Sequence, residues 1–250
     1  MRVGTVQISA LIVLLFVAAF LVAQSSPEQL QVGPPPMRRA EPPAPGASAA
    51  DLEKQADDLR GDKSYLDALD YYRAALQKNP NSATLYNKVG ITELMIRRNK
   101  EARKDFERAL KLDKRYADAY NNLGVAYYAD KNPGKAIKLY KKAIELHADV
   151  APYHNNLGAA YFQKRDFEKA VASYSEAIRL DPNFAQAFNA RGYAQLRLGR
   201  RREALADLNH AIELNPAYKN AHQNRAAVRR SLGDIKGAEA DAARAATLID

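Results

Sequence analysis

The fold of this chain is decided by the stretch AYNNLGVAYYADKNPGKAIKLYKKAIELHA at residues 119–148. Apolar and small residues recur at steps of three and four from Tyr120 to Tyr127, and again from Ala136 to Ile144. This spacing places them along one side of a helix. Between the two sets, Asn132-Pro133-Gly134 supplies a capping side chain and a proline suited to the first helical position. The stretch therefore predicts two amphipathic helices joined by a short turn.

The pattern returns every 34 residues. Small residues at fixed places let two helix backbones approach closely, so their columns specify the size of the side chain at each contact. Proline ends units in the same phase at residues 80, 182 and 216, because it disfavours helix at the residue before it. A fixed period of this kind indicates a solenoid of stacked helix pairs. The three columns are Ala56, Gly90, Gly124, Gly158, Gly192 and Ala226; Ala68, Ala102, Ala136, Ala170, Ala204 and Ala238; and Ala75, Ala109, Ala143, Ala177, Ala211 and Ala245.

The quoted stretch resembles the tetratricopeptide repeat, and so does PYHNNLGAAYFQKRDFEKAVASYSEAIRLDP at residues 152–182. The resemblance implies an all-α fold, a right-handed α-solenoid in which antiparallel helix pairs stack into a superhelix. It implies that the first helices line a concave channel that binds peptides or partner helices, and it implies no catalysis. The resemblance covers six repeats, at residues 49–82, 83–116, 117–150, 151–184, 185–218 and 219–250.

Repeats five and six depart from the family pattern. Arg191 and Arg225 stand where an apolar residue is usual, and we expect them to be tolerated because their methylene groups can pack. The last predicted helix, GAEADAARAATLID at residues 237–250, has no large apolar residue before Leu248. It can act as a solvated cap, since terminal repeats of solenoids are expected to differ. The alternative is an exposed edge through which two chains form a homodimer.

The first 48 residues have a different composition. No charged residue occurs from Val3 to Pro27, and residues 8–23 read ISALIVLLFVAAFLVA. This length allows either a signal peptide or an uncleaved membrane anchor over residues 1–25. Prolines concentrated in residues 26–48 indicate a semi-rigid linker, with a proline-rich ligand for a partner as the alternative. With Arg2 held on the inner side, we expect the repeats to be exported, either periplasmic or anchored to the inner membrane facing the periplasm.

Composition and motifs exclude several classes of function. The chain has no cysteine, which rules out disulfides, zinc–thiolate sites and a cysteine nucleophile. We recognise neither catalytic nor metal-binding motifs, so we expect no enzyme activity, cofactor or metal. The formal net charge is +9, but the densest basic run, residues 97–104, is interrupted by Glu101. It indicates a solvated helix face, and no nucleic-acid partner is expected.

If the geometry of the family holds, the binding surface lies on the concave side of the first helices. Carboxamide side chains there can both donate to and accept from a peptide backbone, and aromatic side chains suit partner side chains. The function indicated is a non-catalytic protein- or peptide-binding scaffold of the cell envelope. The alternatives are a module that self-associates through the C-terminal repeat and a basic adaptor for anionic lipids or polymers. The candidate residues are Asn87, Asn121, Asn122, Asn155, Asn156, Asn189, Asn224, Tyr128, Phe162 and Tyr193.

Overall fold

The structure is a computed structural model that describes residues 41–248. The predicted membrane segment and most of the proline-rich linker lie outside the described residues. All regular elements of the described part are helices. They are α2 (Ala49–Gly61), α3 (Tyr65–Lys78), α4 (Ala83–Met95), α5 (Asn99–Leu112), α6 (Ala117–Ala129), α7 (Pro133–Leu146), α8 (Ala151–Gln163), α9 (Phe167–Leu180), α10 (Ala185–Arg197), α11 (Arg201–Leu214), α12 (Lys219–Ser231) and α13 (Ile235–Thr247).

Local sequence signals set several helix starts. The hydroxyl of Ser48 accepts a hydrogen bond from the backbone N–H of Asp51, which satisfies a donor in the first turn of α2. Asn132 caps α7 in the same way, and Pro133 occupies the first turn, where its missing N–H costs nothing. The predicted turn between the two helices of repeat three is therefore built as the sequence indicates.

Glycine sets the distance between the two helices of a repeat. A Cβ added to Gly124 would lie 2.6 Å from the ring of Tyr140, and one added to Gly158 would lie 2.7 Å from the ring of Tyr174. Both rings are almost fully buried, so they have little room to move away. A larger side chain at these glycines would separate the pair.

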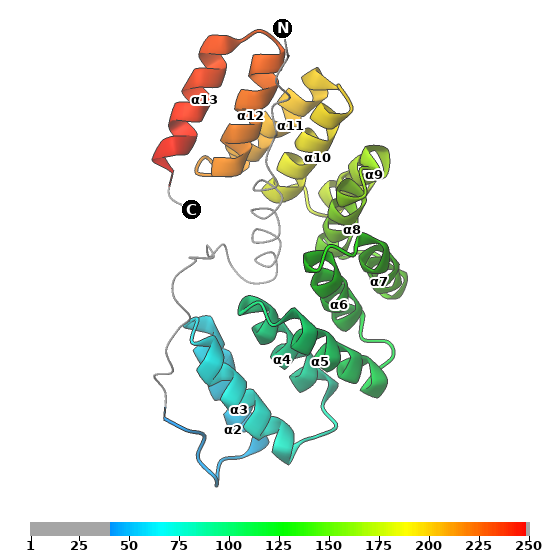
Figure 1. Cartoon of the computed structure of the whole chain (residues 1–250), viewed down its shortest axis with the longest axis vertical. Coiled ribbons are helices and arrows are strands. Elements are labelled where there is room, and N and C mark those ends of the chain that lie inside the picture. The colour runs from blue at the N-terminus through cyan, green and yellow to red at the C-terminus, as the bar shows by residue number, and fades with distance from the viewer. Residues whose placement is uncertain (1–40, 249–250) are drawn as a thin grey trace, which may run out of the picture.

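The helix pairs stack in chain order. Each first helix packs on its own second helix and on the second helix of the preceding repeat, as α6 does on α7 and α5. First helices of neighbouring repeats also contact one another, in the series α4, α6, α8, α10 and α12. Figure 1 shows the pairs along a curved path from α2–α3 to α12–α13, with α6 and α8 on the hollow side and α7 and α9 outside. The predicted all-α solenoid of helix pairs is confirmed.

The chain before α2 packs against the first repeat. Tyr71 donates its hydroxyl hydrogen to the carbonyl oxygen of Glu41 at 3.1 Å, and Lys78 donates to the carbonyl oxygen of Pro45 at 3.0 Å. Ala47 joins the apolar cluster of the first helix pair. Within residues 41–248, no helix is both long enough and apolar enough to cross a bilayer.

Candidate functional site

Seven asparagines predicted for the site lie where successive first helices meet. Six are buried, with exposed fractions between 0% and 5%, and Asn224 is partly buried. They pair across the joints between repeats, so that a carboxamide of one repeat donates to a carboxamide of the repeat before it. These bonds tie the inner side of the solenoid together. The pairs are Asn122 Nδ2 to Asn87 Oδ1 at 3.0 Å, Asn156 Nδ2 to Asn121 Oδ1 at 2.8 Å, and Asn224 Nδ2 to Asn189 Oδ1 at 2.8 Å.

The series is broken at the joint between repeats four and five. Repeat five has Ala190 at the position where the donor asparagine stands in other repeats, so no carboxamide of repeat five can donate to Asn155. The Oδ1 atoms of Asn155 and Asn156 are both buried without a hydrogen-bond partner in the described part of the chain. An unsatisfied buried acceptor costs about 1–3 kcal/mol, so a donor supplied from outside would be stabilised there. Four of the predicted asparagines occupy the acceptor position, and in the described part of the chain only Asn155 receives no hydrogen bond from the next repeat; the other three are Asn87, Asn121 and Asn189.

Aromatic side chains gather at the same joint. The ring of Phe162 on α8 lies 5.2 Å from that of Tyr193 on α10 and 5.1 Å from that of Phe167 on α9. All three side chains are partly exposed. The guanidinium of Arg197 lies 4.8 Å from the centre of the Phe167 ring, within cation–π distance. We call Phe162, Phe167 and Tyr193 the aromatic cluster, and it offers apolar contact beside a positive charge.

Tyr128 has a different position from the other two predicted aromatic residues. It is 5% exposed and belongs to the core cluster that joins repeats two to four. Burial raises the pKa of its hydroxyl to about 12. The structure therefore brings Phe162 and Tyr193 together at an accessible joint, while Tyr128 packs inside.

A buried carboxylate of repeat two is paired with an arginine of repeat one. Glu93 is fully buried, and Arg73 Nη2 contacts its Oε1 at 2.9 Å. Burial and, next, the charge of Asp105 raise the pKa of Glu93 to about 7, although Arg73 opposes them. The repeat pattern did not predict this group. Its signal was an acid in the column that holds Tyr127 and Tyr161 in repeats three and four.

The two unusual arginines of repeats five and six form buried ion pairs. Arg191 contacts Asp207 through Nε to Oδ2 at 2.8 Å and Nη2 to Oδ1 at 2.7 Å. Arg225 makes the same two-point contact with Asp241, at 2.9 Å and 2.6 Å. Packing of the methylene groups, which the sequence predicts, therefore explains only part of how these two arginines are accommodated. The missed signal was an aspartate 16 residues after each arginine.

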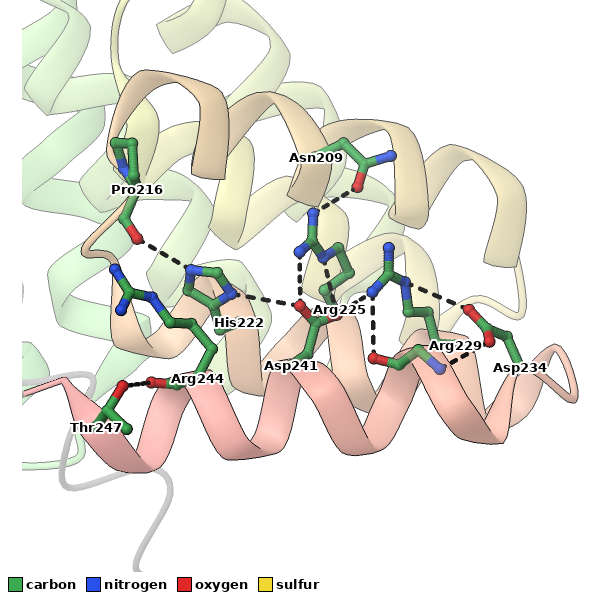
Figure 2. Close-up of polar contacts among 10 residues, drawn as sticks. Asn209, Pro216, His222, Arg225, Arg229, Asp234, Asp241, Arg244 and Thr247 are labelled. Atoms are coloured by element: carbon green, nitrogen blue, oxygen red, sulfur yellow. Dashed lines mark hydrogen bonds and ion pairs between the residues drawn. The ribbon is translucent and has the colours of Figure 1, made fainter.

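Asp241 is the centre of a larger network in the last repeat. Figure 2 shows His222 and Arg229 converging on it beside Arg225. Arg229 Nη1 lies 2.9 Å from its Oδ2, and His222 Nδ1 lies 3.3 Å from its Oδ1. Burial alone would raise the pKa of Asp241, but hydrogen bonds from Arg225 and His222 hold it below its ordinary value. The network fastens α13 to α12 where large apolar residues are missing.

Comparison with protein families decides the identity of the repeats. Models described as tetratricopeptide repeat match residues 81–149 and 185–218, and one described as TPR repeat matches residues 160–199. The chain belongs to the tetratricopeptide repeat family. No curated protein matches it.

Solved structures of tetratricopeptide repeat proteins share the fold. YrrB, described as a TPR protein with an unusual peptide-binding site, is 25% identical over 70% of this chain and 90% of its own, with a TM-score of 0.55. TTC0263 of Thermus thermophilus is 23% identical over 72% of this chain and 98% of its own, with a TM-score of 0.62. PilW, described as a type IV pilus biogenesis factor, is 16% identical over 78% of this chain and 91% of its own, with a TM-score of 0.73. The fold and these neighbours support a protein-interaction scaffold, and such repeats are typically non-catalytic.

Proposed function

We propose that this chain is a non-catalytic scaffold of the cell envelope that binds an extended segment of a partner protein on the inner side of repeats four and five. One observation carries the proposal: buried amide oxygens without partners and a partly exposed aromatic cluster occur at the same joint of the described chain. At the other joints with a donor asparagine, the predicted asparagines are hydrogen-bonded to one another.

The chemistry of the joint suits a peptide. The carboxamide oxygen of Asn155 is buried and has no partner among the described residues, and a turn of this side chain toward the inner surface would let it accept from a backbone N–H of an extended segment. An apolar or aromatic side chain of the same segment can pack on Phe162 and Tyr193. Arg197 beside them favours an acidic residue or a free carboxyl group next to that side chain. YrrB, a protein of the same fold, is described as having a peptide-binding site, which supports this class of partner.

A peptide array tests the proposal. Dodecamers of random sequence are screened against the purified protein, and each binder is then measured in solution by fluorescence anisotropy. We expect Phe162→Ala with Tyr193→Ala to weaken binding about tenfold or more, because buried aromatic anchors commonly contribute over 1 kcal/mol. Phe188→Ala is the control, since its ring packs on His210, away from the cluster. If the double variant bound the peptides as tightly as the Phe188→Ala control, and both melted at the same temperature, the proposed site would be refuted.

The envelope location is proposed from the uncharged apolar run at residues 8–23. Cell fractionation with mass measurement of the mature N-terminus tests it. We expect the protein in the periplasmic or inner-membrane fraction, and an intact chain in the cytoplasmic fraction alone would contradict the location while leaving the binding surface untouched.

Self-association through the last repeat is the second candidate. Leu232 and Ile235 are 43% and 51% exposed, and both lie at the turn between α12 and α13. Light scattering across a dilution series, with Leu232→Ser and Ile235→Ser as the comparison, decides it. A mass that stays monomeric at every concentration would remove this candidate.

A further inference from the structure

The turns between first and second helices place one residue per repeat in the left-handed region. Repeats five and six have glycine there, with φ of +76° at Gly199 and +86° at Gly233. Repeats one to four have lysine or arginine instead. Glycine adopts positive φ without strain, whereas a side chain with a Cβ is disfavoured. The four are Lys63 at 61°, Arg97 at 61°, Lys131 at 57° and Arg165 at 65°.

Three of these four cations form no polar contact with the described part of the chain. The side chains of Arg97, Lys131 and Arg165 are exposed and make no hydrogen bond or ion pair within residues 41–248. The nearby acids are already engaged, because Arg103 pairs with Asp130 and Lys169 pairs with Asp166. The positive charge at these turns is therefore not neutralised locally.

Further cations lie beside them. Because every helix pair stacks in the same orientation, all turns between first and second helices lie along one edge of the solenoid. The opposite edge mixes charges, with Asp113 beside Lys114 and Arg115 and with Asp149 and Asp181 in later repeats. The exposed cations that we call the basic edge are Arg97, Arg98, Lys131, Lys164, Arg165, Arg200, Arg201 and Arg202.

We propose that the basic edge binds an anionic lipid bilayer and sets how the solenoid lies on the membrane. A row of exposed cations spread over four repeats suits a flat, extended, negatively charged surface. The apolar run at residues 8–23 favours a lipid surface over a nucleic acid, since it would hold the repeats near a membrane. This surface is distinct from the proposed peptide site on the inner side of the curve.

The linker can bring this edge to the bilayer. The chain packs against the first repeat from Glu41 on, so 17 residues separate it from the apolar run, and they can span roughly 50 Å if extended as polyproline II. A helix of 13 residues, such as α2, is only about 20 Å long, so either edge of the solenoid is within reach. Charge then selects the edge that faces the lipid.

A fluorescent reporter tests the proposal, and the absence of cysteine allows a single labelling site. The full chain is labelled at Gly134→Cys, on the basic edge, or at Ala148→Cys on the opposite edge. It is added to vesicles of phosphatidylcholine alone or mixed with phosphatidylglycerol, each containing a headgroup quencher. We expect quenching of the Gly134→Cys label in the mixed vesicles, weakened by added salt, and little quenching of the other label.

A glycine triple variant, Arg97→Gly with Lys131→Gly and Arg165→Gly, removes three cations without harming the backbone. Glycine suits the positive φ, so the variant should melt no lower than the parent. We expect it to need about tenfold or more vesicle lipid for half-maximal quenching, since each basic residue strengthens adsorption several-fold. The matched control removes three exposed cations elsewhere, as Lys114→Gln, Arg115→Gln and Lys141→Gln, and should bind within about twofold of the parent.

Two results would overturn the proposal. One is equal quenching on neutral and anionic vesicles, which would show that the apolar segment alone holds the chain there. The other is equal loss in the glycine variant and its control, which would show a response to net charge without a specific edge.

Discussion

The ion pair of repeat five gives the sharpest test of how the solenoid is held together. We consider Arg191→Leu, Asp207→Leu and the double variant. The side chains are 20% and 9% exposed, and two short contacts join them. Removing one partner of a buried pair costs about 3–5 kcal/mol because the other charge stays buried. Since the guanidinium keeps some contact with water, we expect about 2–4 kcal/mol for Asp207→Leu.

The double variant should recover most of this loss. Repeat three has Leu123 and Leu139 at the corresponding positions, and both pack in its core. Apolar residues of similar volume often replace a buried ion pair at little cost, so we expect the double variant within about 1 kcal/mol of the parent. The coupling between the two sites is then about 2 kcal/mol or more.

Urea unfolding followed by far-ultraviolet circular dichroism measures the cycle. The reciprocal control is Leu123→Arg in repeat three, which should be strongly destabilising alone and partly rescued by Leu139→Asp. If Asp207→Leu cost no more than the double variant, the pair would contribute nothing specific, and the account of the departures in repeats five and six would be wrong.

Three further outcomes are expected. Gly158→Leu should lower stability by about 1–3 kcal/mol, measured by thermal melting, because even a Cβ would meet Tyr174 at 2.7 Å. Glu93, with its pKa raised from 4.5 to about 7, binds its proton more tightly in the folded chain. Its contribution to stability is therefore complete below about pH 4.5 and is lost as the pH rises through about 7. Melting temperatures across that window should show this fall, and Glu93→Gln should remove it; an unchanged slope would refute the assignment. Ala190→Asn should donate to Asn155 and weaken array-selected peptides about tenfold without lowering the melting temperature, and unchanged affinity would separate the carboxamide from binding.

The sequence was sufficient to predict the helix pairs and their stacking. Columns of glycine and alanine at a fixed period record where two backbones touch, and a contact as close as that of Gly124 with Tyr140 admits few alternatives. Turn signals such as Asn132 before Pro133 then fix where the second helix begins. Because every repeat needs the same close helix contact, small residues recur at the same positions in the sequence and make that contact predictable.

Contacts between particular side chains were harder to predict. The pairing of Asn122 with Asn87 spans 35 residues, one more than the period, and this offset depends on how one repeat is rotated on the next. The ion pair of Arg191 and Asp207 requires knowing which faces of two antiparallel helices meet. Amphipathic spacing also could not distinguish Tyr128, which packs inside, from Phe162, which stays partly exposed.

The binding role of the inner side is the central proposal, and photocrosslinking in the native cell tests it most directly. A benzoylphenylalanine is placed at Phe162 on the inner side or, as the control, at Lys141, an exposed residue of the outer helix α7. We expect a covalent adduct with one defined polypeptide from the inner position, reduced when Ala190→Asn is added, and none from the outer position. Equal adducts from both positions, or none from Phe162, would contradict the account.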